Sequence, residues 1–192
     1  MSTYSDIFDG VVAWTNRPSL IEETNLAIRQ AVRTAHRAGT FPKDLNTLSL
    51  TVVTDQVQQI DLSSVAPDLR AIARVFPTDL DYEYREVQVL DLFDNDGYAR
   101  TDVFWLIGTN LMVRAAAPYS ALSLTYYRHP TLTPIESLSS WIAIEHQDLI
   151  ILWAAATVLA FVGEQEIKTR VELLAGGALR HLVSDSLFIT AR

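Results

Sequence analysis

The hydrophobic positions along the chain change their period twice, and these changes divide it into three regions. In the first region apolar residues recur every three or four positions, which predicts two amphipathic helices ending near Gly39. Ser19 and Glu22 form a capping-box pattern at the start of the second helix, in which each side chain satisfies the other's free backbone amide. Gly39 and Pro42 supply the stop signal expected at its end.

The middle region alternates between apolar and polar positions, which predicts β-structure. Residues 47–52 alternate strictly, as is typical of a strand with one buried face. Residues 103–107 and 111–114 predict a hairpin, because the intervening Gly-Thr-Asn supplies the positive φ that a tight turn requires. Residues 121–127 are expected to add a third strand to the same sheet. Further strands are expected at 59–62, 70–76 and 86–89.

The last region returns to a helical period. Residues 133–136 (Thr-Pro-Ile-Glu) combine an N-cap threonine, a proline at the first helical position and a capping glutamate. Residues 141–163 are hydrophobic nearly all round, which predicts a single buried helix. A final helix is expected over 164–183, and residues 185–192 show no helical pattern. The apolar stripe of the final helix is predicted to be Ile167, Val171, Leu174, Ala178 and Leu182.

These regions together predict an α+β fold, a helical bundle with an inserted antiparallel β-domain. The expected parts are the N-terminal helices (1–45), the β-rich insertion (46–130), the C-terminal helices (131–184) and an extended docking tail (185–192). Hydrophobic residues make up 49% of the 192 residues and charged residues only 20%, which is enough apolar material for a core. This composition excludes a disordered polypeptide.

The chain is acidic and has no cysteine. Its 15 Lys and Arg against 23 Asp and Glu give a net charge of -8, which argues against a broad grip on nucleic acid phosphates. The missing cysteines exclude disulfides and thiolate sites and favour assembly in a cytoplasm. No signal peptide is apparent, and the apolar run 149–162 is shorter than the roughly 20 residues of a membrane helix. We therefore expect no membrane association.

Residues 94–97 (Asp-Asn-Asp-Gly) invite comparison with a calcium-binding loop. An EF-hand loop with this glycine at its sixth position would begin at Leu92 and end at Val103, where carboxylates are required. Both ends fail, so a polar turn between strands is the better interpretation. The Gly176-Gly177 pair is no phosphate loop, and it is expected to allow close packing of the final helix.

Glu145, His146 and Asp148 could suggest acid–base or metal chemistry. No second histidine follows at helical spacing, and the other histidines share no local pattern with this one. We interpret the three residues as a polar cluster that ends or begins a buried helix. Since no nucleophile with its base is recognisable either, we expect no catalytic residues, no cofactor and no metal.

Two segments are candidates for partner contacts. Arg29, Arg33 and Arg37 lie four residues apart and form a basic strip on the second helix. They would face acidic side chains of a neighbouring subunit or the phosphates of DNA; the alternative is a solvated helix face. The second candidate is the C-terminal segment, which holds three large apolar residues where chain ends are normally polar. It would dock on a partner or fold back onto its own domain. Its candidate contact residues are Leu187, Phe188, Ile189 and Arg192.

The order of the parts carries a family resemblance along nearly the whole chain, strongest from Phe104 to Leu182. Two helices, a β-insertion and two C-terminal helices follow one another as in the head-to-tail adaptor (connector) proteins of tailed bacteriophages. The chain resembles this family in Ile107-Gly108-Thr109-Asn110-Leu111, Tyr126-Tyr127-Arg128-His129-Pro130, Trp141-Ile142, His146-Gln147-Asp148-Leu149-Ile150, Ala154-Ala155-Ala156, Asn16-Arg17-Pro18-Ser19-Leu20 and Phe41-Pro42-Lys43-Asp44-Leu45.

The resemblance implies a structural protein of the virion neck, assembled in the host bacterial cytoplasm as a dodecameric ring. Such a ring binds the portal protein above and a tail nozzle or tail completion protein below, and the genomic DNA passes through it at ejection without sequence-specific binding. The family has no catalytic residues to carry over. An acidic chain suits a channel that DNA traverses without adhering. The alternatives are another ring-forming tail protein, such as a tail terminator, and a soluble interaction module.

Overall fold

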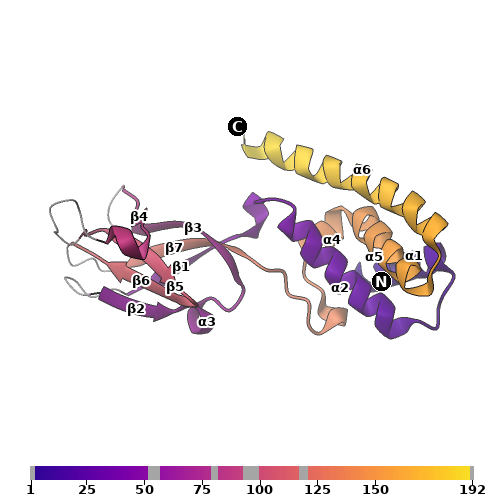
Figure 1. Cartoon of the computed structure of the whole chain (residues 1–192), viewed down its shortest axis with the longest axis horizontal. Coiled ribbons are helices and arrows are strands. Elements are labelled where there is room, and N and C mark those ends of the chain that lie inside the picture. The colour runs from indigo at the N-terminus through magenta and orange to yellow at the C-terminus, as the bar shows by residue number, and fades with distance from the viewer. Residues whose placement is uncertain (1–2, 52–56, 79–81, 93–99, 117–120, 191–192) are drawn as a thin grey trace. The chain divides into compact units, whose positions relative to one another are not determined.

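The structure of the chain, a computed structural model, has helices at both ends of the sequence and strands in the middle (Figure 1). The terminal helices pack together and two mostly antiparallel sheets are inserted between them, which confirms the predicted α+β class. Residues 1–43 and 129–192 form one compact unit, the helical unit, and residues 44–128 form the other, the β unit. The structure describes residues 3–51, 57–78, 82–92, 100–116 and 121–190.

The helical unit is built around one central helix, α5, which is apolar on all sides. Helices α1, α2, α4 and α6 each pack against α5. The bounds are α1 Thr3–Thr15, α2 Ile21–Arg37, η3 Ile135–Ser137, α4 Trp141–Glu145, α5 Gln147–Val162 and α6 Gln165–Thr190, with η1 Pro42–Asp44 at the junction of the units. The core that results combines Ile7 and Val11 of α1, Ile28 and Val32 of α2, and Ile150 of α5.

Helix α2 begins one residue later than the capping box requires. Its N-cap is Leu20, without a side-chain cap, and the Thr24 amide donates to the Leu20 carbonyl at 3.0 Å. Ser19 therefore lies outside the helix, and the predicted capping box is wrong. The other end follows the prediction, because α2 stops at Arg37, before Gly39.

Two helix predictions in the C-terminal region are also wrong. Residues 133–136 do not begin an α-helix: only the short 3₁₀ turn η3 follows, with Pro134 at its N-cap and no side-chain cap. The apolar segment expected to be one helix is broken at His146 into α4 and α5. The Ser140 hydroxyl caps α4 by accepting from the Ala143 amide at 3.1 Å, so the start signal that operates is a serine seven residues later than predicted.

The last helix is longer than predicted. α6 continues to Thr190, so the segment expected to be an extended tail is helical from residue 185 as far as Thr190. No glycine or proline interrupts residues 178–190, so nothing in the backbone stops the helix there. Its predicted apolar stripe is confirmed only in part. Val171 and Leu182 are buried as predicted, together with Ala175, whereas Ile167 and Leu174 of the predicted stripe are 43% and 53% exposed.

The β unit holds two sheets. One has three strands in the order β1-β7-β3, and the other has four in the order β2-β6-β5-β4. The pairings are antiparallel except β4 with β5. The bounds are β1 Leu45–Leu50, β2 Val57–Asp61, α3 Leu62–Val65, β3 Leu69–Pro77, β4 Arg85–Glu86, η2 Val89–Asp91, β5 Val103–Ile107, β6 Asn110–Arg114 and β7 Leu122–Arg128.

The predicted hairpin is confirmed, but its expected third strand is not. β5 and β6 pair across a turn in which Gly108 has a φ of 60°. β7 joins the other sheet, between β1 and β3, so it is not a third strand beside this hairpin. The chain between β6 and β7 is longer than a hairpin turn, and pairing with two distant strands buries Leu122, Leu124 and Tyr126 of β7.

Candidate functional site

A groove lies on the helical unit between α1 and α6, and α5 forms its floor. The cavity has a volume of about 580 Å³. Ile151 and Leu152 of α5 contribute the floor, and small residues are frequent on the walls. We call this cavity the α1–α6 groove. Its lining residues are Gly10, Ala13, Trp14, Asp148, Ile151, Leu152, Leu174, Gly177, Ala178 and His181.

Small residues shape both walls of the α1–α6 groove, for different reasons. A Cβ on Gly10 would lie 2.6 Å from Ile151 Cδ1, so this glycine lets α1 approach α5 closely. On α6, no described atom lies within 4 Å of the Cβ that an alanine would add at Gly176 or Gly177. The prediction that the glycine pair allows close helix packing is therefore wrong within the described chain. Gly177 instead leaves the groove open.

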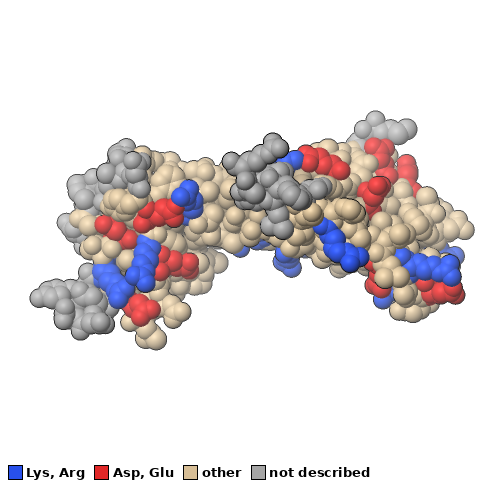
Figure 2. All heavy atoms as spheres, turned by 90° about the horizontal axis from the view of Figure 1, so that it is seen from above, with Lys and Arg blue, Asp and Glu red and all other residues tan. Residues whose placement is uncertain are grey.

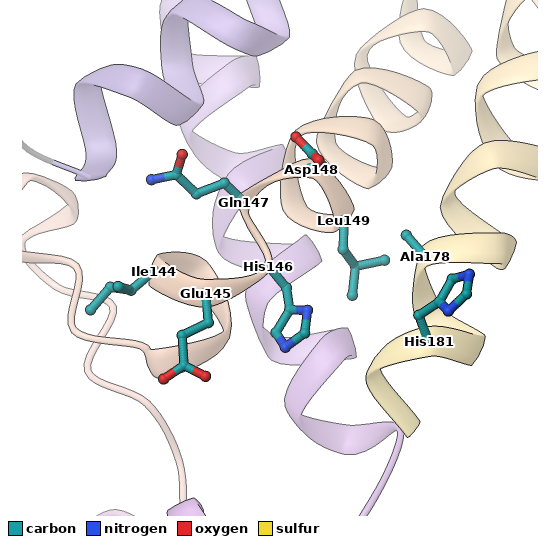
Figure 3. A pocket seen from close by; sticks show the side chains of 8 residues that line it. All are labelled: Ile144, Glu145, His146, Gln147, Asp148, Leu149, Ala178 and His181. Carbon is teal, nitrogen blue, oxygen red and sulfur yellow. The ribbon is translucent and has the colours of Figure 1, made fainter. Parts of the chain in front are cut away.

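A second cavity, of about 390 Å³, adjoins the groove at the start of α5. Figure 3 shows its lining residues, among which Asp148, Ala178 and His181 are shared with the α1–α6 groove. His146 and His181 reach it from the α4–α5 junction and from α6. The Asp148 carboxylate points away from the His146 ring (Figure 3). The cavity thus holds the predicted polar cluster, but without a shared centre for its side chains.

Two members of this polar cluster, Glu145 and His146, contact neighbours within the helical unit. Glu145 accepts from Lys43 Nζ at 2.6 Å and 2.5 Å through its two carboxylate oxygens. Lys43 also lies 4.9 Å from the centre of the Trp141 ring, and His146 packs edge-on against the same ring. Nowhere in the described chain do three or more His, Asp or Glu side chains gather to hold a metal ion. The arrangement therefore fixes the α4–α5 junction.

The basic strip lies on the outer side of α2. Arg33 and Arg37 are exposed, and Arg29 is half-buried beside Tyr4. No ion pair is found for these three arginines within the described residues, and Arg29 Nε lacks a hydrogen-bond partner there. Leu26, which precedes Arg29 and Arg33 by three and seven residues, is 55% exposed on the same face. Sequence reasoning found the arginines but missed this leucine, which the i, i+3, i+7 spacing places among them.

Large apolar side chains remain exposed where α5 ends and along α6. Phe161 is 67% exposed, Leu173 73% and Leu174 53%. Figure 2 looks down on the side of the helical unit that carries α6, where wide stretches of uncharged surface separate the acidic and basic side chains. A water-facing surface rarely keeps several such residues together without a partner.

The remaining candidate residues lie at or beyond the limit of the described side chains. Leu187, Phe188 and Ile189 fall within the helical backbone of α6, and Arg192 lies outside the described residues. The polar turn predicted at 94–97 lies outside them as well. None of the described helices is long and apolar enough to cross a membrane.

One pair of buried side chains in contact with each other was not predicted from the sequence. His36 Nε2 and Ser140 Oγ lie 2.9 Å apart, and both residues are buried. A serine beside a histidine has the composition of an activated nucleophile. Here, however, the hydroxyl oxygen caps α4 and the pair sits inside the core, so its contacts serve the fold. The two residues are 104 positions apart, and no local pattern could have joined them.

Comparison of the chain with known proteins identifies no family. No protein-family model matches the sequence, and no curated protein matches it either.

Proposed function

We propose that the chain is a head-to-tail adaptor of a tailed bacteriophage, a structural protein whose copies form a ring between the portal and the tail. The observation that carries the proposal is the unpartnered apolar surface of the helical unit. Phe161, Leu173 and Leu174 are all more than half exposed, and Leu174 lines the open α1–α6 groove. Such surfaces belong to subunits that become buried on assembly.

Two further features support the same function. The resemblance of the sequence to the adaptor family is strongest from Phe104 to Leu182, a stretch that includes the α4–α5 junction at His146. The net charge of -8 suits a ring whose channel must let DNA slide through. The proposal gives the chain no catalytic role and no cofactor. Its partners are further copies of itself, the portal protein, and a tail nozzle or tail completion protein.

Electron microscopy and mass measurement test the proposal directly. The purified chain is imaged and weighed by native mass spectrometry, alone and after mixing with the portal protein of the same phage. We expect a ring of twelve copies attached to portal. A chain that stays monomeric in both samples, at concentrations up to the millimolar range, would overturn the proposal and leave a soluble interaction module.

A further sample, in which the chain is mixed with the tail-tube protein of the same phage, separates the adaptor from a tail terminator. A terminator also forms a ring but binds the end of the tail tube, so it should co-sediment with tail-tube protein and leave portal unbound. Binding to portal with no binding to the tail tube identifies the adaptor. The reverse result identifies the terminator.

A further inference from the structure

The outer face of α2 carries a row of side chains that could pack between two helices of another molecule. Leu26, Arg29, Arg33 and Arg37 follow one another at spacings of three or four residues, so they lie on one side of the helix. We call these four residues the α2 ridge. The opposite side of α2, with Ala27, Ile28, Ala31, Val32 and Ala35, is buried in the core of its own unit. The α2 ridge therefore faces away from the core of its own unit.

The α1–α6 groove has the complementary shape and a defined direction. Gly10 lies against Ile151, and Arg17 pairs with Glu164, so α1 and α5 run parallel. α6 follows α5 after a short turn and runs back along it, which brings His181 to the start of α5 beside Asp148. The groove thus has one end at Asp148 and His181, and its walls continue from there to Trp14 and Leu174.

Acidic side chains mark the Asp148 end of the groove. Asp148 lines the cavity and is exposed. Asp6 is exposed and precedes Gly10 by four residues, which places it on the groove side of α1 near the same end. No ion pair is found for either carboxylate within the described residues. At the other end the charged side chains are paired: Arg17 with Glu164, and Arg170 with Glu166.

The distance from the charged side chain to the apolar side chain is the same on the α2 ridge and along the α1–α6 groove. Leu26 and Arg33 are seven residues apart on α2, and Leu174 and His181 are seven residues apart on α6. At about 1.5 Å per residue, each span is about 10 Å long. When Arg33 lies at the acidic end of a groove, Leu26 therefore reaches Leu174. Ala13, Gly177 and Ala178 keep the walls low enough for a helix to approach.

We propose that the α2 ridge of one copy seats in the α1–α6 groove of the next, with its arginines at Asp6 and Asp148 and with Leu26 against Trp14 and Leu174. The inference rests on the proposed function, because it names the contact that joins neighbouring subunits. The ridge and the groove share no residue, so the contact is heterologous. A repeated heterologous contact closes into a ring when its rotation allows.

Cysteine cross-linking tests this contact in the full chain, which has no cysteine of its own. Leu26→Cys and Leu174→Cys are made in separate chains, mixed and oxidised. We expect a cross-linked dimer from the mixture, and a ladder of larger products from the chain that carries both changes. The matched control replaces Leu174→Cys by Leu173→Cys, because Leu173 is the neighbouring residue and is more exposed, at 73%.

A charge exchange tests the polar end of the same contact. Arg33→Glu should weaken self-association at least tenfold in sedimentation velocity, and Asp148→Arg should do the same. Combining the two changes in one chain should restore part of the loss, whereas Arg85→Glu, on an exposed strand of the β unit, should have little effect.

The outcomes separate this contact from the proposed function. If rings form but Leu26→Cys joins Leu173→Cys as readily as Leu174→Cys, the contact is wrong and the adaptor proposal stands. If Arg33→Glu and Asp148→Arg leave self-association unchanged, the contact is wrong as well. If no species larger than a monomer forms with or without portal, both proposals fail.

Discussion

His36 Nε2 and Ser140 Oγ lie 2.9 Å apart inside the helical unit and join the end of α2 to the start of α4. The serine oxygen also accepts from the Ala143 amide, so one hydroxyl serves a helix cap and a long-range contact. The Trp141 ring, which follows the serine, lies edge-on to the same histidine. This pair therefore determines how α4 leaves the preceding loop.

Replacing Ser140 by alanine should lower the free energy of unfolding by about 1–3 kcal/mol. The change removes an N-cap and the hydroxyl that bonds a buried imidazole. Urea denaturation followed by circular dichroism measures the effect. Ser140→Thr retains the hydroxyl and is the matched control, with a smaller expected loss. Equal stability of Ser140→Ala and the parent chain would show that the hydroxyl contributes nothing.

Tyr126 should make the stability of the β unit depend on alkaline pH. Its hydroxyl donates to Asp68 Oδ1 at 3.0 Å and accepts from Asn46 Nδ2 at 2.9 Å. Burial, followed by the hydrogen bond to Asp68, raises the pKa of Tyr126 above 10.0. A raised folded-state pKa gives stability that is complete below the unfolded pKa, near 10, and is lost as pH rises through the folded pKa.

Tyr126→Phe tests this dependence. The variant should lose about 1–2 kcal/mol near pH 7, because it removes two hydrogen bonds to the half-buried side chains of Asn46 and Asp68. Its stability should then fall less steeply than that of the parent chain above pH 10, in urea denaturation at a series of pH values. Some slope should remain, because burial also raises the pKa of Tyr4. Parallel curves for the two chains would contradict the assignment.

Two helical glycines should respond in opposite directions to alanine. At Gly176 the added methyl meets no described atom, so the gain in helix propensity should raise the free energy of unfolding by about 0.5–1 kcal/mol. At Gly10 it would meet Ile151 at 2.6 Å, and overpacking should outweigh the same gain by about 1 kcal/mol. Thermal unfolding of both variants measures the difference. Stabilisation by Gly10→Ala would show that α1 and α5 separate easily.

Cutting the chain after Ser184 should leave the helical unit folded and abolish attachment to portal. Among the side chains of α6 that the structure describes, which end at residue 184, the buried ones are Val171, Ala175 and Leu182. Leu187, Phe188 and Ile189 follow it, and each large apolar side chain buried at a partner contributes about 1.5–3 kcal/mol. Many identical ends on one ring would strengthen the attachment further.

Circular dichroism and co-sedimentation with portal measure the two effects separately. An unfolded truncated chain would show that the end of α6 belongs to its own core. Normal binding of a folded truncated chain would place the portal contact elsewhere. Leu187→Ala in the full-length chain is a milder variant, expected to bind portal more weakly while keeping its fold.

The sequence predicted best those elements whose signal is local. The β5–β6 hairpin was predicted because two apolar strands flank a glycine-containing turn, and α2 was predicted to end before Gly39. The break at His146 has no such signal, since neither glycine nor proline is present. At the break the His146 backbone has a φ of -128° and a ψ of 49°, outside the helical range, and its ring packs edge-on against Trp141. The start of α2 was misplaced because a capping pattern in sequence does not determine which residue adopts the N-cap backbone.

The candidate site was predictable only in part. The basic strip is recognisable from the sequence, because Arg29, Arg33 and Arg37 recur at the regular spacing of one helix face. The α1–α6 groove could not be identified in the same way, because Gly10, Ile151 and Gly177 come from three helices that are distant in the chain. A cavity between packed elements depends on their tertiary arrangement, about which local periodicity carries no information.

The central position of α5 has a consequence for the order in which the molecule folds during synthesis. Its residues, Gln147–Val162, leave the ribosome after the entire β unit, which is complete at Arg128. α1 and α2 emerge first, yet α5, the helix that covers their apolar faces, is followed only by α6 in the sequence. The β unit is thus the first that can fold. Until α5 has been made, Ile7 and Val11 of α1 and Ile28 of α2 remain uncovered. Nascent chains are therefore most exposed to aggregation from the synthesis of residue 44 until α5 is complete at Val162.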